Sequence, residues 1–192
     1  MSEMLSERGK ALENEFFHRV DKNLLERIRQ QEMQHVVRDQ ICGATGVSDP
    51  SLLEEFVQLG LRAESILALS LMPMVHVAWA DGKVSAKERA AILQAAEQAG
   101  CTTGSPGHDL LTSWLSVDAL EPTLFHAWKG YVHELQKGMS PDGRKALRKN
   151  LLDRASQVAK AAGGILGLAS ISVKERKALD EIAAIIDAPP AA

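Results

Sequence analysis

Two carboxylates flank a short turn near the middle of the chain and could take part in metal chemistry. Asp81 and Glu88 lie at either end of the segment Asp81-Gly82-Lys83-Val84-Ser85-Ala86-Lys87-Glu88. Carboxylate oxygens suit hard divalent cations, provided that the turn brings the two side chains together. The spacing therefore makes a cation site one hypothesis for this segment.

The same segment also has a purely structural explanation. Gly82 stands where the end of a helix often requires a positive φ angle. Ser85 and Glu88 have the S-x-x-E spacing of a capping box for the next helix. An EF-hand is excluded, because apolar Val77 and Trp79 stand where its loop needs Asp or Asn. Capping boxes are common, so the structural explanation and the cation site both remain open.

A degenerate copy of this corner follows near the C-terminus, as Ser170-Ile171-Ser172-Val173-Lys174-Glu175-Arg176. The copy keeps the apolar residue and the capping pair, Ser172 and Glu175. Leu168 and Ala169 replace the Asp-Gly of the first corner, so the second corner has one carboxylate fewer. Two such corners suggest an internal pseudo-repeat of helical hairpins.

The first corner, with the preceding Ala80, matches the motif A-D-G-x-[IV]-S-x-x-E in full. In this motif the chain resembles the tellurite-resistance TerB-like proteins, and the spacing of the two corners extends the resemblance over residues 64–187. The resemblance implies an all-α bundle and an accessory or scaffold role in stress-response assemblies. It also implies a divalent-cation site, whose ligands here would be Asp81, Glu88 and Glu175. The identity of the metal ion stays open.

Helical periodicity dominates the chain, and no alternating β-branched run bounded by hairpin turns is present. The fold class predicted is all-α. Ser48 is the expected N-cap of the second helix, and Pro73 is expected to kink the third. The helices are expected at residues 5–41, 48–60, 61–81, 85–98, 109–115, 121–136, 141–162 and 172–186.

The charges suggest a division of the chain near residue 60. Residues 1–60 carry 7 basic and 11 acidic side chains, against 15 and 14 in the remainder. We expect residues 1–60 to form an acidic, amphipathic helical extension. Residues 61–188 are expected to form the helical domain, and residues 189–192 a frayed tail.

Composition excludes several classes of protein. The chain has 192 residues, is 45% hydrophobic and has a net charge of −3, which does not fit a disordered protein or a non-specific nucleic-acid binder. The longest uncharged stretch, residues 65–80, contains Pro73 and is too short to span a bilayer. Two cysteines and no visible export signal in MSEMLSERGK favour a cytoplasmic protein.

Other residue types were weighed as binding or catalytic groups. His126 and His133 are seven residues apart, which is not the spacing of a zinc-binding helix pair. His76 is interpreted as a histidine at the edge of the core, and the glycines at 163–167 as packing residues rather than a phosphate loop. The three tryptophans favour core anchoring, with a peptide-binding groove as the alternative. One helix is basic and could contact an acidic partner through Arg144, Lys145, Arg148 and Lys149.

The function predicted is a non-catalytic interaction module that binds a divalent cation at the acidic corner. One alternative is a structural scaffold or oligomerisation protein without metal, joined through the acidic extension and the basic face. Another is a small metal-dependent hydrolase built on His126 and His133. The sequence names neither a partner nor a substrate.

Overall fold

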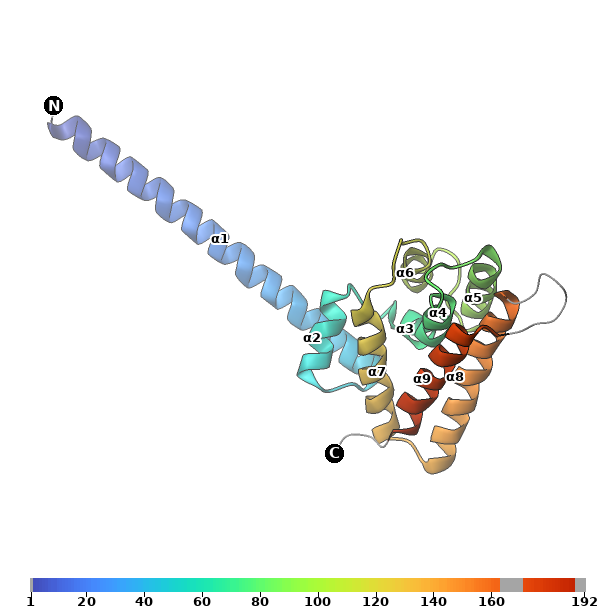
Figure 1. The fold of residues 1–192 in the computed structure, drawn as a ribbon. Coiled ribbons are helices and arrows are strands. Elements are labelled where there is room, and N and C mark those ends of the chain that lie inside the picture. The colour runs from blue at the N-terminus through green and yellow to red at the C-terminus, as the bar shows by residue number, and fades with distance from the viewer. Residues whose placement is uncertain (1, 163–170, 189–192) are drawn as a thin grey trace. The chain divides into compact units, whose positions relative to one another are not determined.

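The computed structural model describes residues 2–162 and 171–188, with side chains from residue 22 onward. Within these ranges the chain forms nine helices and no strand, as the periodicity predicted (Figure 1). No helix in the described ranges is both long and apolar enough to cross a bilayer. The helices are α1 (Ser2–Thr45), α2 (Pro50–Gln58), α3 (Ile66–Ser70), α4 (Met72–Ala78), α5 (Ala86–Gln98), α6 (Pro106–Trp114), α7 (Pro122–Lys137), α8 (Pro141–Ala162) and α9 (Val173–Asp187).

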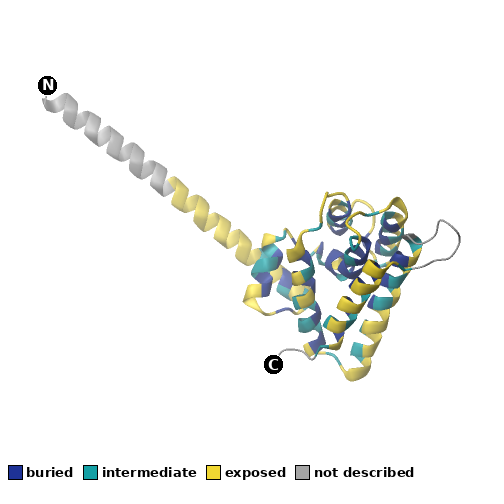
Figure 2. Ribbon diagram, viewed as in Figure 1, coloured by how far each residue is buried: buried dark blue, intermediate teal, exposed yellow. Residues whose placement is uncertain are grey.

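Helix α4 lies at the centre of the fold. It contacts α3, α5, α7, α8 and α9, and every one of its residues except His76 is buried. Figure 1 shows α4 among these neighbours, and the ribbon at this place in Figure 2 is largely dark blue, the colour of buried residues. Burying apolar side chains on all sides of one helix supplies much of the stabilising free energy of such a core. His76 is therefore the polar, partly exposed residue of an otherwise apolar and buried helix.

The sequence predicted one long helix with a kink at Pro73, and this prediction is wrong. Pro73 lies in the first turn of α4, and α3 ends just before it at Ser70. Proline lacks a backbone N–H, so a helix can begin at that position at little cost but cannot continue through it. The predicted helix to residue 81 is also too long, because α4 ends at Ala78.

The start of α2 is also corrected. The N-cap is Asp49, whose carboxylate accepts a hydrogen bond from the Leu52 backbone N–H at 2.9 Å, and not Ser48. Helix α6 begins at Pro106, earlier than predicted, with the Ser105 hydroxyl capping it. Helix α8 covers the predicted residues 141–162, and α5, α7 and α9 each begin one residue after the predicted start.

The chain divides into two compact units, residues 1–39 and 40–192. The predicted boundary at residue 60 is therefore too late. Helix α2 contacts α7, and its apolar stripe of Leu52, Leu53 and Phe56 is buried, so it belongs to the larger unit. Charge counting misplaced the boundary because the acidic residues of α2 lie on the other side of a buried helix.

Some predictions concern residues outside the described ranges. These are the glycines at 163–167, Leu168, Ala169 and Ser170 of the second corner, and the tail at 189–192. For residues 2–21 the structure describes the helix but no side chains.

Candidate functional site

The first corner has the local structure that its residue types predicted. Gly82 adopts φ +92°, a conformation that glycine reaches without the strain of a side chain. The Ser85 hydroxyl accepts from the Glu88 backbone N–H, and Glu88 Oε2 accepts from the Ser85 backbone N–H at 2.7 Å. This complete capping box begins α5. Ser172 and Glu175 form the same reciprocal pair at the start of α9.

The two capping glutamates are buried and lie within electrostatic reach of each other. Glu88 is 4% exposed and Glu175 is 7% exposed. Burial raises the pKa of Glu88, and its hydrogen bonds with Ser85 oppose that rise. The negative charges of Asp81 and Glu175 raise the pKa of Glu88 further. The fold therefore brings the three predicted metal ligands into one electrostatic neighbourhood.

These carboxylates are not arranged as a metal centre. Among the residues that the structure describes, no group of three or more His, Cys, Asp or Glu side chains is placed to hold a metal ion. Glu88 and Glu175 each turn one oxygen to a backbone N–H, and Asp81 is exposed, with a long contact of 3.4 Å to the Lys83 N–H. A cation would require these side chains to move.

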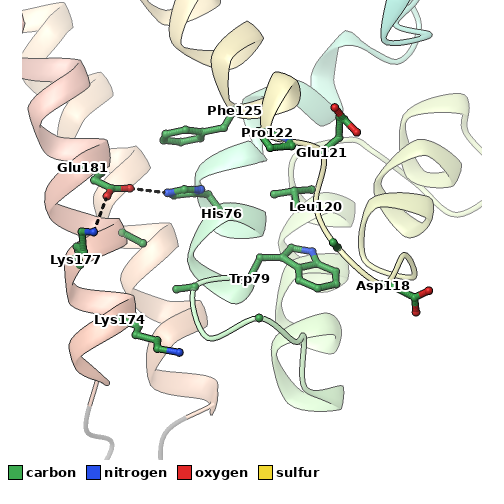
Figure 3. Close-up of a pocket in the computed structure, with 14 residues that line it drawn as sticks. His76, Trp79, Asp118, Leu120, Glu121, Pro122, Phe125, Lys174, Lys177 and Glu181 are labelled. Atoms are coloured by element: carbon green, nitrogen blue, oxygen red, sulfur yellow. Dashed lines mark hydrogen bonds and ion pairs between the residues drawn. The ribbon is translucent and has the colours of Figure 1, made fainter.

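An open cavity of about 640 Å³ adjoins the corner, and the sequence did not reveal it. Its walls come from the end of α4, the loop before α7, the start of α7 and one face of α9 (Figure 3). The side chains that line it include His76, Trp79, Phe125, Lys174, Lys177 and Glu181. Ala80 and Gly82 of the corner also line it, so the cavity and the motif adjoin.

Aromatic rings form one wall of the cavity. The His76 and Phe125 rings are stacked with centroids 3.7 Å apart, and Phe125 stacks in turn on buried Trp128 at 5.2 Å. The Trp79 indole N–H donates to the Trp114 carbonyl at 3.2 Å, which satisfies its polar atom and leaves its ring on the cavity wall. The wall is thus apolar and is held in place by the core behind it.

A polar chain crosses the cavity from α4 to α9. His76 Nε2 lies 3.1 Å from Glu181 Oε2, and Glu181 Oε1 lies 3.8 Å from Lys177 Nζ. Burial lowers the pKa of His76, and Glu181 partly offsets this through its hydrogen bond and charge. The neutral imidazole therefore predominates at neutral pH. Since a carboxylate only accepts, the proton of this neutral ring lies on Nε2 and is donated to Glu181.

Charged side chains of both signs surround the cavity. Lys174 extends from α9, and Asp118 lies on the loop across from it, as Figure 3 shows. Glu121 also lines the loop side, and its carboxylate accepts from the Thr123 hydroxyl at 3.3 Å. The rim is therefore polar and mixed in charge, around an interior with aromatic walls.

The remaining candidates lie elsewhere. His126 is exposed, the His133 Nε2 is buried without a hydrogen-bond partner, and neither lines the cavity. On α8, Arg148 forms two hydrogen bonds with Asp187, and Arg144 donates to the Met139 carbonyl. The basic face is therefore partly committed to holding α8 against its neighbours.

Sequence reasoning missed Glu181, Phe125 and the loop at 118–121. The spacing of Lys174, Lys177 and Glu181 does place them on one face of a helix, which was a readable signal. Nothing in the sequence paired that face with His76, 105 residues away.

Comparison with known proteins does not extend this description. The chain matches no protein-family model, no curated protein and no solved structure.

Proposed function

We propose that the chain is a non-catalytic, TerB-like interaction module that takes an apolar side chain of a protein partner into the cavity beside the acidic corner. The observation that carries this proposal is the cavity of about 640 Å³ with its wall of His76, Phe125 and Trp79. Concave, aromatic sites with a few placed polar groups are the usual form of recognition pockets.

The polar groups of the cavity favour recognition over catalysis. His76 bonds to Glu181, Glu181 pairs with Lys177, and the Trp79 N–H bonds to a backbone carbonyl. Each group is thus occupied in holding the wall. Groups held in this way provide a preorganised binding surface, which reduces the entropy lost on binding.

The loop before α7 has a depression on each side that such a partner could occupy. Ala119, Leu120 and Glu121 line the main cavity and also a second depression of about 350 Å³, which Trp114 and Val117 help to form. Val117 is 46% exposed. A partner that places apolar side chains on both sides of this loop would bury more apolar surface than the main cavity offers alone.

A neutral aromatic probe tests the cavity directly. 2-Naphthamide added to the ¹⁵N-labelled full chain should shift the backbone amide signals of Gly82, Ala119 and Ala178 in a saturable way. Ala119→Trp, at an exposed position, should fill the cavity and weaken binding at least about tenfold. Lys129→Trp, on an exposed part of α7 away from the cavity, is the matched control and should bind normally. Equal binding by both variants would contradict the proposal.

A divalent cation at the acidic corner is the second candidate function. It is favoured by the electrostatic coupling of Asp81 and Glu175 to Glu88. Mg²⁺, Ca²⁺ and Mn²⁺, each added alone, should raise the melting temperature of the wild type. Asp81→Asn should reduce that increase, whereas Asp153→Asn, on the exposed side of α8, should not. Equal increases of the melting temperature in the wild type and in Asp81→Asn would contradict cation binding at the corner.

A further inference from the structure

The sequence of residues 22–39 of α1 is complementary to itself when it is read in the opposite direction. Pairing each residue with the one whose number completes a sum of 61 gives nine pairs. Three pairs join apolar residues, two join opposite charges, and none joins like charges. The pairs are Lys22/Asp39, Asn23/Arg38, Leu24/Val37, Leu25/Val36, Glu26/His35, Arg27/Gln34, Ile28/Met33, Arg29/Glu32 and Gln30/Gln31.

Five of the six apolar members of this pattern are exposed in the structure, and Val37 is half-buried. Leu24, Leu25, Ile28, Met33 and Val36 are between 42% and 63% exposed. Large apolar side chains scattered singly on a surface are ordinary, but here five lie within thirteen residues of one helix, spread over about half of its circumference. This density of exposed apolar side chains favours contact with a further surface.

One seam of the helix carries both opposite-charge pairs and one of the apolar pairs, Leu25/Val36. Positions 22, 25, 29, 32, 36 and 39 alternate in steps of three and four, which places them along one side. In an antiparallel pair of copies, Leu25 would face Val36 of the second copy, and Arg29 would face Glu32 of the second copy. Ile28 and Met33 border the seam. Each of the two apolar layers then lies between layers of opposite charge.

We infer that residues 22–39 bind the same segment of a second copy of this chain in an antiparallel, two-fold symmetric helix pair. In a two-fold symmetric pair, every contact between two different residues occurs twice, so each charge pair is formed twice. Polar layers within a seam fix register and orientation at some expense of stability. The pair is accordingly specific but of modest strength, and it weakens as salt screens the charges.

One contact within the helix competes with this arrangement. His35 Nδ1 lies 3.0 Å from Asp39 Oδ2 in the same helix. Both side chains are 70% exposed, so the contact is weak and leaves Asp39 able to meet Lys22 of the second copy.

Charge reversal on the full chain tests the pairing. Arg29→Glu alone would place two glutamates opposite each other at both symmetric sites, and Glu32→Arg alone would place two arginines there. Each variant should dimerise at least about tenfold more weakly than the wild type in sedimentation velocity. An equimolar mixture of the two variants restores every opposite-charge contact, so it should recover dimers.

Arg27→Glu is the matched control, since Arg27 lies on the side of the helix away from the seam. It should dimerise like the wild type, and circular dichroism should show equal helix content in all variants. The inference would be overturned if both charge-reversal variants still dimerised, or if their mixture stayed monomeric. It would also be overturned if the wild type were monomeric at high concentration and low salt.

A disulfide test fixes the orientation. In a Cys42→Ser background, mild oxidation of Lys22→Cys mixed with Asp39→Cys should give the mixed disulfide. Neither variant alone should cross-link, because its two cysteines would lie about 26 Å apart along the pair. Disulfide-linked dimers of Lys22→Cys alone would indicate a parallel pair and contradict the inference.

Discussion

His76 joins the apolar core to the cavity through two different contacts. One face of its ring is stacked on Phe125, and its Nε2 meets Glu181 across the cavity. The side chain is 22% exposed, so most of it has left water. Burial disfavours the charged imidazolium more than the Glu181 carboxylate supports it, and the pKa of His76 lies below its ordinary value.

The opposing effects of burial and of Glu181 on the pKa of His76 predict the result of replacing Glu181. Glu181→Gln removes the negative charge and leaves only a neutral, weaker hydrogen-bond acceptor, and both the charge and the carboxylate hydrogen bond raise the pKa of His76, so that pKa should fall further. Titration of the imidazole signals by NMR measures this directly. Asp180→Asn, which changes the neighbouring carboxylate on α9, should leave the titration of His76 nearly unchanged. A rise of the pKa in Glu181→Gln would show that the contact is misassigned.

The same shift makes stability depend on pH. Between the ordinary pKa of histidine, about 6.5, and the lower value in the fold, the unfolded chain binds more protons than the folded chain. The free energy of unfolding should therefore fall as pH drops through this window, and His76 should add no further loss below it. Urea unfolding at a series of pH values should show a smaller dependence in His76→Gln. An unchanged dependence would argue against a lowered pKa.

At the scale of elements, the two capping boxes set where α5 and α9 begin. Each satisfies two backbone N–H groups that the first turn of a helix otherwise leaves unpaired. Ser85→Ala and Ser172→Ala should each lower the free energy of unfolding by about 1 kcal/mol, measured by urea titration. Ser113→Ala, at an exposed position within α6, should have little effect. Equal losses in all three variants would mean that the caps add nothing specific.

Local signals explain how much of the fold could be predicted. Periodicity and caps located most helices, and α8 was predicted to the residue. Errors arose where two local signals competed, as at Ser48 and Asp49, either of which can cap a helix. Pro73 was another such case, since it fits both a kink and a first turn.

The candidate site was much harder to predict because it depends on tertiary packing. The sequence indicated the corner residues, and the structure confirms their caps and the positive φ of Gly82. The cavity instead joins α4, the loop before α7 and α9, which are distant in sequence. Only packing brings His76 to Glu181, and no periodic pattern records that contact.

At the scale of the whole molecule, the chain consists of a helical segment at residues 1–39 and a helical domain at residues 40–192. Removing residues 1–39 should shift the melting temperature of the domain by no more than about 2 °C, because residues 40–192 form a compact unit with a hydrophobic core of their own. Thermal melts of the truncated and full chains compare the two. A large decrease would show that residues 1–39 help to stabilise the domain.

Intermolecular NOEs would show whether the cavity beside the acidic corner is the recognition surface that we propose. With 2-naphthamide bound to the full chain, we expect NOEs from the naphthalene ring protons to the side chains of Trp79, Phe125 and Ala178. NOEs that instead place the ring at other side chains, with none to Trp79 or Phe125, would contradict it.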